Sequence, residues 1–444
     1  MANYTREEIL SMAEEEDVEF IRLQFTDMFG TMRNIAITSS QLEKALNNEC
    51  MFDALPLEGF AVEDGTDMYL HPDLDSFVIL PWRPQQGKVA RMICDVYKAD
   101  GTPYECCSRG ILKRCIARAR EMGYEFYAGP RCEFFLFQTD EEGQPTNQTP
   151  ERAGYFDLGP IDMGENARRD IVLTLEDMGF RVESSYHEVA PGQHEIDFHR
   201  AKGLESADSV MTFKFAVRTI ARRHGLHATF MPKPKTGVSG SGMHLNFALY
   251  DREGRNIFRN NEDPLGLSQE AYYFIGGILK HISGMSAITN PLVNSYKRLV
   301  PGFEAPLYEA WSAHKKNSLI RIPAAKGGHK EIELRSPDPA ANPYLALAVC
   351  LMAGIDGIQN KILPPAPVDQ EMDSICEEEK GKLGIMALPS TLREAITAME
   401  EDPFIRTVLG DAFVDRYVEA KKSEWKEYML QVSDWEVDQY LYRI

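Results

Sequence analysis

The most informative segment of the chain is His187-Glu-Val-Ala-Pro-Gly-Gln-His-Glu-Ile-Asp-Phe198. Its Pro191-Gly192 pair is a turn signal, with proline at the second position and glycine at the third. If the turn joins two antiparallel strands symmetrically, Glu188 and Glu195 face each other, because both lie equally far outside the pair. Opposed carboxylates destabilise a strand pair unless a cation lies between them. The segment therefore predicts either a cation site or two exposed glutamates beside a turn.

Three further segments repeat this theme, because period-2 alternation places polar side chains on one face of each predicted strand. The residues are Arg131 and Glu133 in 131–137, His244, Asn246 and Ala248 in 244–249, and Glu331, Glu333 and Arg335 in 331–335. Such faces either meet solvent or converge inside one funnel. Carboxylates with a single imidazole suit hard divalent cations, Mg²⁺ or Mn²⁺, better than zinc.

Two loops lie between these strands in the sequence. The glycine-rich run 233–244 lets a ligand approach the backbone closely, but it lacks the GK[ST] ending of a P-loop. The polar run 294–306 carries Arg298 and Glu304. It is either a candidate lid or an ordinary surface loop.

Length and composition describe an ordinary globular protein. The 444 residues are 43% hydrophobic and 26% charged, and they suffice for two or more domains. There is no apolar run of about 18 residues that would span a membrane, and the N-terminus has no apolar signal core, which favours the cytoplasm. A net charge of -20 argues against nucleic acid as a partner. The eight cysteines lack zinc-finger spacing and are expected to be reduced thiols.

Turn residues at Asp100-Gly-Thr-Pro103 predict a boundary between a small N-terminal domain, 1–103, and a larger domain, 104–444. Periodicity predicts helices over 5–15, 109–122, 165–179, 206–224 and 268–285, and strands over 20–25, 35–37, 77–80, 90–94 and 131–137. The last third is predicted to be largely helical, with a capping box at 391–394. Aromatic residues in 435–442 predict that the last turns dock on another surface.

Taken in order, these segments resemble the type I glutamine synthetases, in the short branch that lacks the adenylylation segment. The resemblance rests on Met51-Phe-Asp53, the strand around Glu133, HEVAPGQHE, KPxxGxxGSGMH, NSYKRLVPGFEAP and the RSPDPAANPYLA run from Arg335. It implies an α+β fold, in which an N-terminal β-grasp-like domain precedes a catalytic domain with a curved antiparallel sheet and a helical C-terminus. It also implies a homo-oligomer, a dodecamer of two stacked hexamers, whose active sites are shared between subunits.

The resemblance also implies the reaction. With the help of Mg²⁺ or Mn²⁺, ATP would phosphorylate the γ-carboxylate of glutamate. Ammonium would bind and lose a proton, and the resulting ammonia would attack the acyl phosphate and release phosphate. By motif position, the metal ligands would be Glu133, Glu188 and Glu195 at one site and His244 and Glu333 at a second. Glutamate would be bound by Gly240, Arg298, Glu304 and Arg335, and the nucleotide by Glu183, Lys316 and Arg321.

Three residues would have catalytic roles in the family's reaction. Asp53, supplied by a neighbouring subunit, would accept a proton from ammonium. Glu304 would shield the intermediate from water. Arg321 would stabilise the transferred phosphoryl group.

The chain departs from the family pattern mainly on the nucleotide side. Arg131 stands where the second metal site has a glutamate, and repulsion between two unit charges costs about 4 kcal/mol at 4 Å and an effective dielectric of 20. The other departures are Glu331, Lys316, Ala248, Ser239, Ala54-Leu55-Pro56 and Val62. We hypothesise that Arg131 and Glu331 pair and close the ATP end. Two alternatives to a glutamine synthetase follow: a γ-glutamyl ligase for another amine, and a regulatory paralogue that oligomerises but does not use ATP normally.

Overall fold

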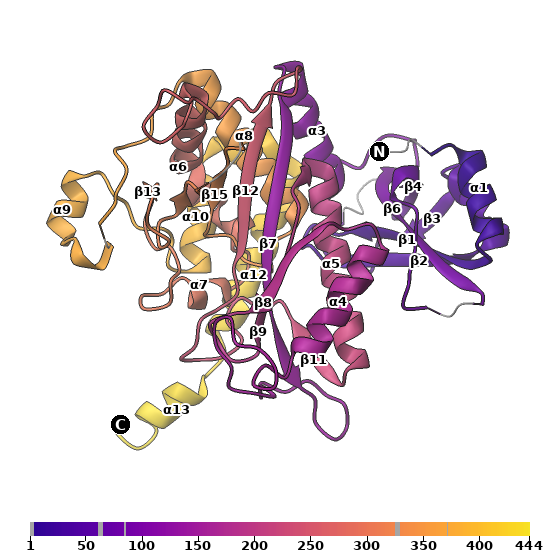
Figure 1. Ribbon diagram of the computed structural model, residues 1–444, viewed down its shortest axis with the longest axis horizontal. Helices are drawn as coiled ribbons and strands as arrows, with labels where there is room; N and C mark the ends of the chain where they lie inside the picture. Colours follow the sequence, from indigo (N-terminus) through magenta and orange to yellow (C-terminus); the bar gives the residue numbers. More distant parts are fainter. Residues whose placement is uncertain (1–3, 61–64, 84–85, 325–328, 371) are drawn as a thin grey trace.

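The computed structural model describes residues 4–60, 65–83, 86–324, 329–370 and 372–444. Two sheets organise the chain: a small one near the N-terminus and a larger one with helices packed around it (Figure 1). This arrangement confirms the predicted α+β fold.

The N-terminal sheet has the strand order β2-β1-β6-β4-β3, with β5 paired to β6. The β1–β6 pair is parallel and the other pairs are antiparallel, which is the β-grasp-like arrangement expected. The elements are α1 (Arg6–Glu15), β1 (Val18–Thr26), β2 (Met32–Thr38), α2 (Leu42–Leu46), β3 (Cys50–Asp53), β4 (Asp67–Pro72), β5 (Val78–Ile79) and β6 (Lys88–Lys98).

The larger sheet has the order β13-β14-β15-β12-β7-β9-β8, with β10 and β11 also paired to β7. It is antiparallel except for the β13–β14 pair. Its strands are β7 (Glu125–Gln138), β8 (Val182–His187), β9 (Gln193–Phe198), β10 (Ala201–Lys202), β11 (Leu226–Thr229), β12 (Met243–Tyr250), β13 (Trp311–Ser312), β14 (Ile320–Arg321) and β15 (Ile332–Leu334). The long central strands β7 and β12 therefore lie at the middle of the site-bearing sheet (Figure 1).

Helices form much of the remaining chain. They are α3 (Ser108–Glu121), α4 (Glu165–Asp177), α5 (Gly203–Arg223), α6 (Gln269–Thr289), α7 (Ser295–Arg298), α8 (Pro343–Asn360), α9 (Glu377–Lys382), α10 (Leu392–Glu401), α11 (Pro403–Leu409), α12 (Asp411–Met429) and α13 (Asp434–Tyr440). The buried helices α6 and α8 approach closely at Gly277 and Gly357, where a Cβ on either residue would overlap the backbone of the other helix. Within the described ranges, each helix is too short or too polar to cross a membrane.

A buried arginine joins the two sheets' domains. Arg109 on α3 donates to Asp95 on β6 at 3.0 Å, to Asp73 at 2.6 Å and to Asp208 on α5 at 2.9 Å. Its side chain is only 4% exposed. Because buried charges are stable only when paired, this cluster fixes the N-terminal domain against α5.

The predicted helices and strands are present, with bounds shifted by a few residues, and two local details differ. The strand predicted over 77–80 is only the two-residue β5. Thr391 caps α10, but Glu394 accepts from Ser390 rather than completing a capping box with Thr391. The eight cysteines are free thiols, as expected, and only Cys376 is exposed.

The C-terminal helix α13 projects from the body of the chain (Figure 1). None of its residues is buried, and Trp435 is 62% and Tyr442 93% exposed. Within this single chain, the predicted docking of the last turns is therefore not made.

Candidate metal and anion site

The Pro191-Gly192 hairpin carries two of the predicted carboxylates. The register of β8 and β9 pairs Tyr186 with Glu195, so the prediction that Glu188 faces Glu195 directly is wrong. The connection is wider than a two-residue turn, because the ladder ends with the Glu188 N–H donating to the carbonyl of Gln193 at 2.7 Å. Glu188 is instead a diagonal neighbour of Glu195 on the same face, still within reach of a long side chain.

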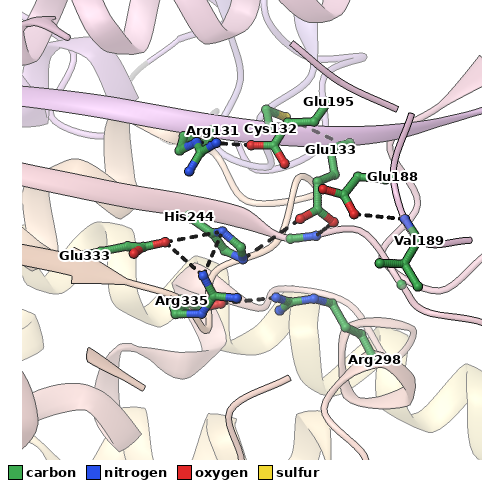
Figure 2. A network of polar contacts seen from close by, with 12 residues as sticks. Arg131, Cys132, Glu133, Glu188, Val189, Glu195, His244, Arg298, Glu333 and Arg335 are labelled. Atoms are coloured by element: carbon green, nitrogen blue, oxygen red, sulfur yellow. Dashed lines mark hydrogen bonds and ion pairs between the residues drawn. The ribbon is translucent and has the colours of Figure 1, made fainter. Parts of the chain in front are cut away.

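Glu133 on β7 completes a carboxylate triad. It lies directly opposite Glu195 in the β7–β9 ladder. One oxygen each from Glu133, Glu188 and Glu195 lies within 4.8 Å of the other two (Figure 2). Glu133 Oε2 accepts hydrogen bonds from Gly242 N at 2.8 Å and Gln193 Nε2 at 2.9 Å, whereas the buried Glu195 Oε1 accepts none from the described residues. The triad fits a hard divalent cation, because oxygen ligands are what such ions prefer.

Electrostatics support the same conclusion. Burial, and then the charge of Glu188, raise the pKa of Glu133 from 4.5 to about 7. Burial also raises the pKa of Glu188, and burial together with Asp197 raises the pKa of Glu195 well above its usual value. Three carboxylates that repel one another in a dry site are relieved either by protons or by a bound cation.

Arg131, also on β7, lies beside the triad rather than across the site. Its Nε donates to Asp197 Oδ1 at 2.8 Å and lies 3.1 Å from Glu195 Oε1, and its Nη2 donates to the Tyr186 hydroxyl at 2.9 Å. Burial alone would lower the pKa of Arg131, but the bonds to Asp197 and the charge of Glu195 raise it instead. Arg131 is therefore a fixed positive charge with partners on β8 and β9.

Glu331 has a different partner, so the hypothesis that Arg131 and Glu331 pair is wrong. Arg200, which follows β9, donates through Nη1 to Glu331 Oε1 and lies with Nη2 2.7 Å from His329 Nδ1. Each of the two unusual residues is neutralised by its own local partner, because the strand order places Asp197 nearer to Arg131 than Glu331.

Arginines face the carboxylates from the other side of His244 (Figure 2). Arg335 Nη1 donates to Glu333 Oε1 at 2.9 Å and lies 3.4 Å from His244 Nδ1, while its buried Nε has no partner among the described residues. Arg298 on α7 is held by the carbonyls of Ser336 and Arg335 at 2.7 and 3.1 Å. These guanidinium groups, with an unused donor, suit an anionic ligand.

The glycine-rich loop packs against Arg298. The carbonyl of Gly240 accepts from Gln193 Nε2 at 3.1 Å, and a Cβ at this glycine would overlap the carbonyl of Pro232. A Cβ at Gly242 would lie 2.6 Å from Arg298 Nη2 and 2.8 Å from His244 Nε2. These glycines are therefore required for the loop to lie against the cationic groups.

The remaining predicted residues lie around this centre. Glu304 is exposed, adopts a left-handed backbone with φ of 41°, and raises the pKa of Glu188 through its charge. Arg321 on β14 pairs through Nε with Glu333 Oε2. The exposed Glu183 pairs with His199 at 2.7 Å, and Lys316 is exposed on the loop between β13 and β14.

Asp53 lies apart from this centre within one chain. It ends β3 in the N-terminal sheet, is exposed, and accepts from Leu55 N at 2.9 Å (Figure 1). The substituted Ala54 beside it is fully buried, and Ala248 on β12 is buried as well. Val62 lies outside the described residues.

Sequence reasoning missed two features of the site. Asp197, the partner of Arg131, lies two residues beyond Glu195 and could have been found by extending the period-2 face of that strand. A second buried group, Asp162, His187 and His194, also brings ligand atoms within 4.8 Å of one another. Arg168 fills it, since its Nη1 lies 2.6 Å from Asp162 Oδ2 and 2.9 Å from His194 Nδ1. No periodicity indicated this group, because Asp162 comes from a loop.

The fold and the site indicate a class: a two-domain enzyme whose carboxylate triad suits a divalent cation and whose neighbouring arginines suit an anionic ligand. Comparison with known proteins makes the class specific. The family model for the glutamine synthetase beta-Grasp domain matches residues 17–99, and the one for the glutamine synthetase catalytic domain matches 105–440. The chain belongs to the glutamine synthetase family, and its activity is that of the family, a glutamate–ammonia ligase that uses ATP and a divalent metal ion.

Individual relatives agree with this membership. Glutamine synthetases from Clostridium saccharobutylicum and Staphylococcus aureus strain Mu50 are 56% identical over 441 residues and 54% over 439. These matches cover 99% of this chain, and 99% and 98% of the two relatives. A solved structure named "GmaS/ADP complex-Conformation 1" has a TM-score of 0.88 at 32% identity, covering 97% of this chain and 99% of that one. The comparisons give no support to the predicted alternatives, ligation of another amine or a regulatory role.

Proposed function

We propose that the carboxylate–arginine centre described above is where this chain makes glutamine, by ligating ammonia to the γ-carboxylate of L-glutamate through γ-glutamyl phosphate. The observation that carries the proposal is the placement of three carboxylates, two buried and one half-buried, beside arginines of which Arg335 keeps an unused donor. Phosphoryl transfer to a carboxylate brings several negative charges together, so its main requirement is fixed positive charge in a water-poor site.

Glu133, Glu188 and Glu195 are proposed to hold Mg²⁺ or Mn²⁺. The bound ion would neutralise charge on the transferred phosphoryl group. The predicted second-site ligands, His244 and Glu333, lie next to the triad, with His244 Nε2 4.0 Å from Glu133 Oε1. Here Glu333 orients Arg321 and Arg335 through ion pairs.

Glutamate is proposed to bind through Gly240, Arg298, Glu304 and Arg335. Arg298 and Arg335 would hold its α-carboxylate, because guanidinium–carboxylate pairing is strong and directional. The loop position of Glu304 supports a role in shielding the intermediate, and Lys233, whose Nζ lies 3.6 Å from the centre of the Phe303 ring, packs beneath this loop.

ATP is proposed to bind beside Arg321, which would stabilise the phosphoryl group, with Lys316 and Glu183 contacting the nucleotide. The similar solved structure is a complex with ADP, which supports a nucleotide site on this fold. We place the domain boundary at residues 103 and 104, between the strand β6 and the helix α3, and propose a cytoplasmic location.

The assembly is proposed to be a homo-dodecamer of two hexamers in which Asp53 enters the site of a neighbouring copy and accepts a proton from ammonium. Its exposed position at the end of β3 supports this arrangement. The exposed apolar face of α13 is proposed to dock on a second copy, because unburied aromatic groups of this size are usually interface residues.

Substrate dependence tests the proposed reaction. The purified full-length chain is incubated with Mg²⁺ or Mn²⁺, ATP, glutamate and ammonium, and glutamine and phosphate are both measured. Both products are expected only when all components are present. The proposal would be contradicted if phosphate release, or formation of the ligated product, required a different amine in place of ammonium. Arg298→Ala is expected to raise the KM for glutamate at least tenfold, whereas Arg120→Ala at the exposed end of α3 should leave it unchanged.

Native mass tests the assembly. Trp435→Asp on α13 is expected to reduce the dodecamer to smaller species by light scattering, because it buries a charge in the contact. Leu363→Asp, at an exposed apolar residue elsewhere, is the matched control and should leave the mass unchanged. An unchanged mass for the Trp435 variant would refute the docking of α13 on a second copy.

A further inference from the structure

The residues around His244 differ from the triad in one respect: the carboxylate there, Glu333, is already paired with arginines. Glu333 is fully buried, and its two carboxylate oxygens pair with Arg321 and Arg335. In the triad, by contrast, only Glu195 pairs with an arginine among the described residues, Arg131 at 3.1 Å, whereas Glu133 and Glu188 pair with none. The two halves of the site therefore differ in their need for a cation.

Arg131 adds a fixed positive charge to the same region. It lies directly opposite His244 in the β7–β12 ladder, and its guanidinium reaches Glu195 at 3.1 Å. The side chain is held in place by three groups, since Asp197 and Tyr186 accept from it and Glu195 Oε1 lies 3.1 Å from its Nε. Ser184 in turn donates to Asp197 at 2.8 Å. A side chain bound in this way cannot move aside without leaving Asp197 buried and unpaired.

The electrostatic surroundings of His244 are consistent with this picture. Burial lowers the pKa of His244 well below its usual value, and the charges of Arg335, Arg298, Arg131 and Arg321 lower it further. The same positive potential opposes a divalent ion on this imidazole, because both are cations at the same place.

We infer that the chain binds a single divalent cation, at Glu133, Glu188 and Glu195. No second ion binds at His244 and Glu333, because the guanidinium of Arg131, beside Glu195, already supplies the positive charge that such an ion would carry. The inference rests on the proposed function only for the metal role of the triad. It gives Arg131 a positioning and charge-balancing role in place of a metal ligand.

The test is a direct count of bound ions. Mn²⁺ is titrated into the full-length oligomer without nucleotide, because a nucleotide carries its own cation, and bound and free Mn²⁺ are distinguished by electron paramagnetic resonance. One ion per chain is expected. Two ions per chain in the unmodified protein would overturn the inference without need of any variant.

Variants at Arg131 test the cause. Arg131→Glu is expected to bind two Mn²⁺ per chain, and Arg131→Lys, which keeps the charge, one. Arg131→Gln provides the second measurement if the glutamate variant does not fold: its affinity for a second ion should rise at least tenfold. A folded Arg131→Glu or Arg131→Gln chain that still binds only one ion with unchanged affinity would refute the role of the guanidinium.

Two further readouts separate this inference from the proposed function. Glu133→Gln should lose the single ion, and if it does not, the triad is not the metal site and the inference fails. Glutamine formation is measured on the same preparations. A chain that binds one ion but makes no glutamine would contradict the proposed reaction and leave the ion count standing.

Discussion

Glu133 couples the stability of the metal-free protein to pH. Its pKa rises from 4.5 in an unfolded chain to about 7 in the folded one, because of burial first and Glu188 second. The folded state therefore binds more protons than the unfolded state between these values. The stabilising contribution is fully present below pH 4.5 and is lost as the pH rises through 7. One pKa unit corresponds to about 1.36 kcal/mol, so the free energy of unfolding falls by about 3 kcal/mol.

Glu133→Gln removes this titration while keeping an oxygen that can accept from Gly242. The assay is urea-induced unfolding at matched protein concentration in EDTA, from pH 5 to pH 8, for the original chain and the variant. The original chain should lose about 3 kcal/mol of unfolding free energy relative to the variant across this range. Saturating Mg²⁺ should restore that loss above pH 7 in the original chain only, because the ion replaces the protons.

Two outcomes would refute this reasoning. Parallel pH curves for the two chains would show that Glu133 does not titrate in the range. A Mg²⁺ effect of equal size in both would show that the ion stabilises the fold from another site. Sodium chloride at matched ionic strength is the control for general screening.

Two further predictions concern packing and charge. Gly242→Ala should cost about 1–3 kcal/mol and raise the KM for glutamate, because its Cβ would lie 2.6 Å from Arg298 Nη2. Gly110→Ala on α3, where the nearest atom lies at 3.5 Å, is the matched control. It should leave the KM unchanged and should not lower the melting temperature, because alanine favours a helix over glycine. Arg109→Ala should lower the unfolding free energy by about 3–5 kcal/mol, because it leaves buried carboxylates unpaired. Arg120→Ala, at an exposed residue, should change it by less than about 1 kcal/mol. Similar urea midpoints for these two variants would contradict the structural role of Arg109.

Local patterns were sufficient to identify the elements that carry the site. The period-2 alternation in 131–137 and 244–249 correctly predicted strands with one polar face, because side chains on a strand point alternately to its two sides. The turn signal at Pro191-Gly192 correctly predicted a hairpin. It did not predict the register, since loop width decides which residues pair, and Glu195 faces Tyr186 instead of Glu188.

The charge pairing required the strand order. Arg131 and Glu331 looked like reciprocal replacements in the sequence, yet each pairs with a residue on or just after β9, Arg131 with Asp197 and Glu331 with Arg200. Sequence spacing carries no information on which of several carboxylates lies nearest to a guanidinium across neighbouring strands.

The sequence by itself determined the two-domain α+β fold, the family and the set of polar residues, because these follow from periodicity, turn chemistry and motif order. The tertiary structure alone decided that Glu133 lies opposite Glu195, that Arg131 is held against Asp197, and that the two oxygens of Glu333 are already paired. The physical reason is that electrostatic energy depends on distances of a few ångströms between groups far apart in the chain, and only the packed sheet sets those distances.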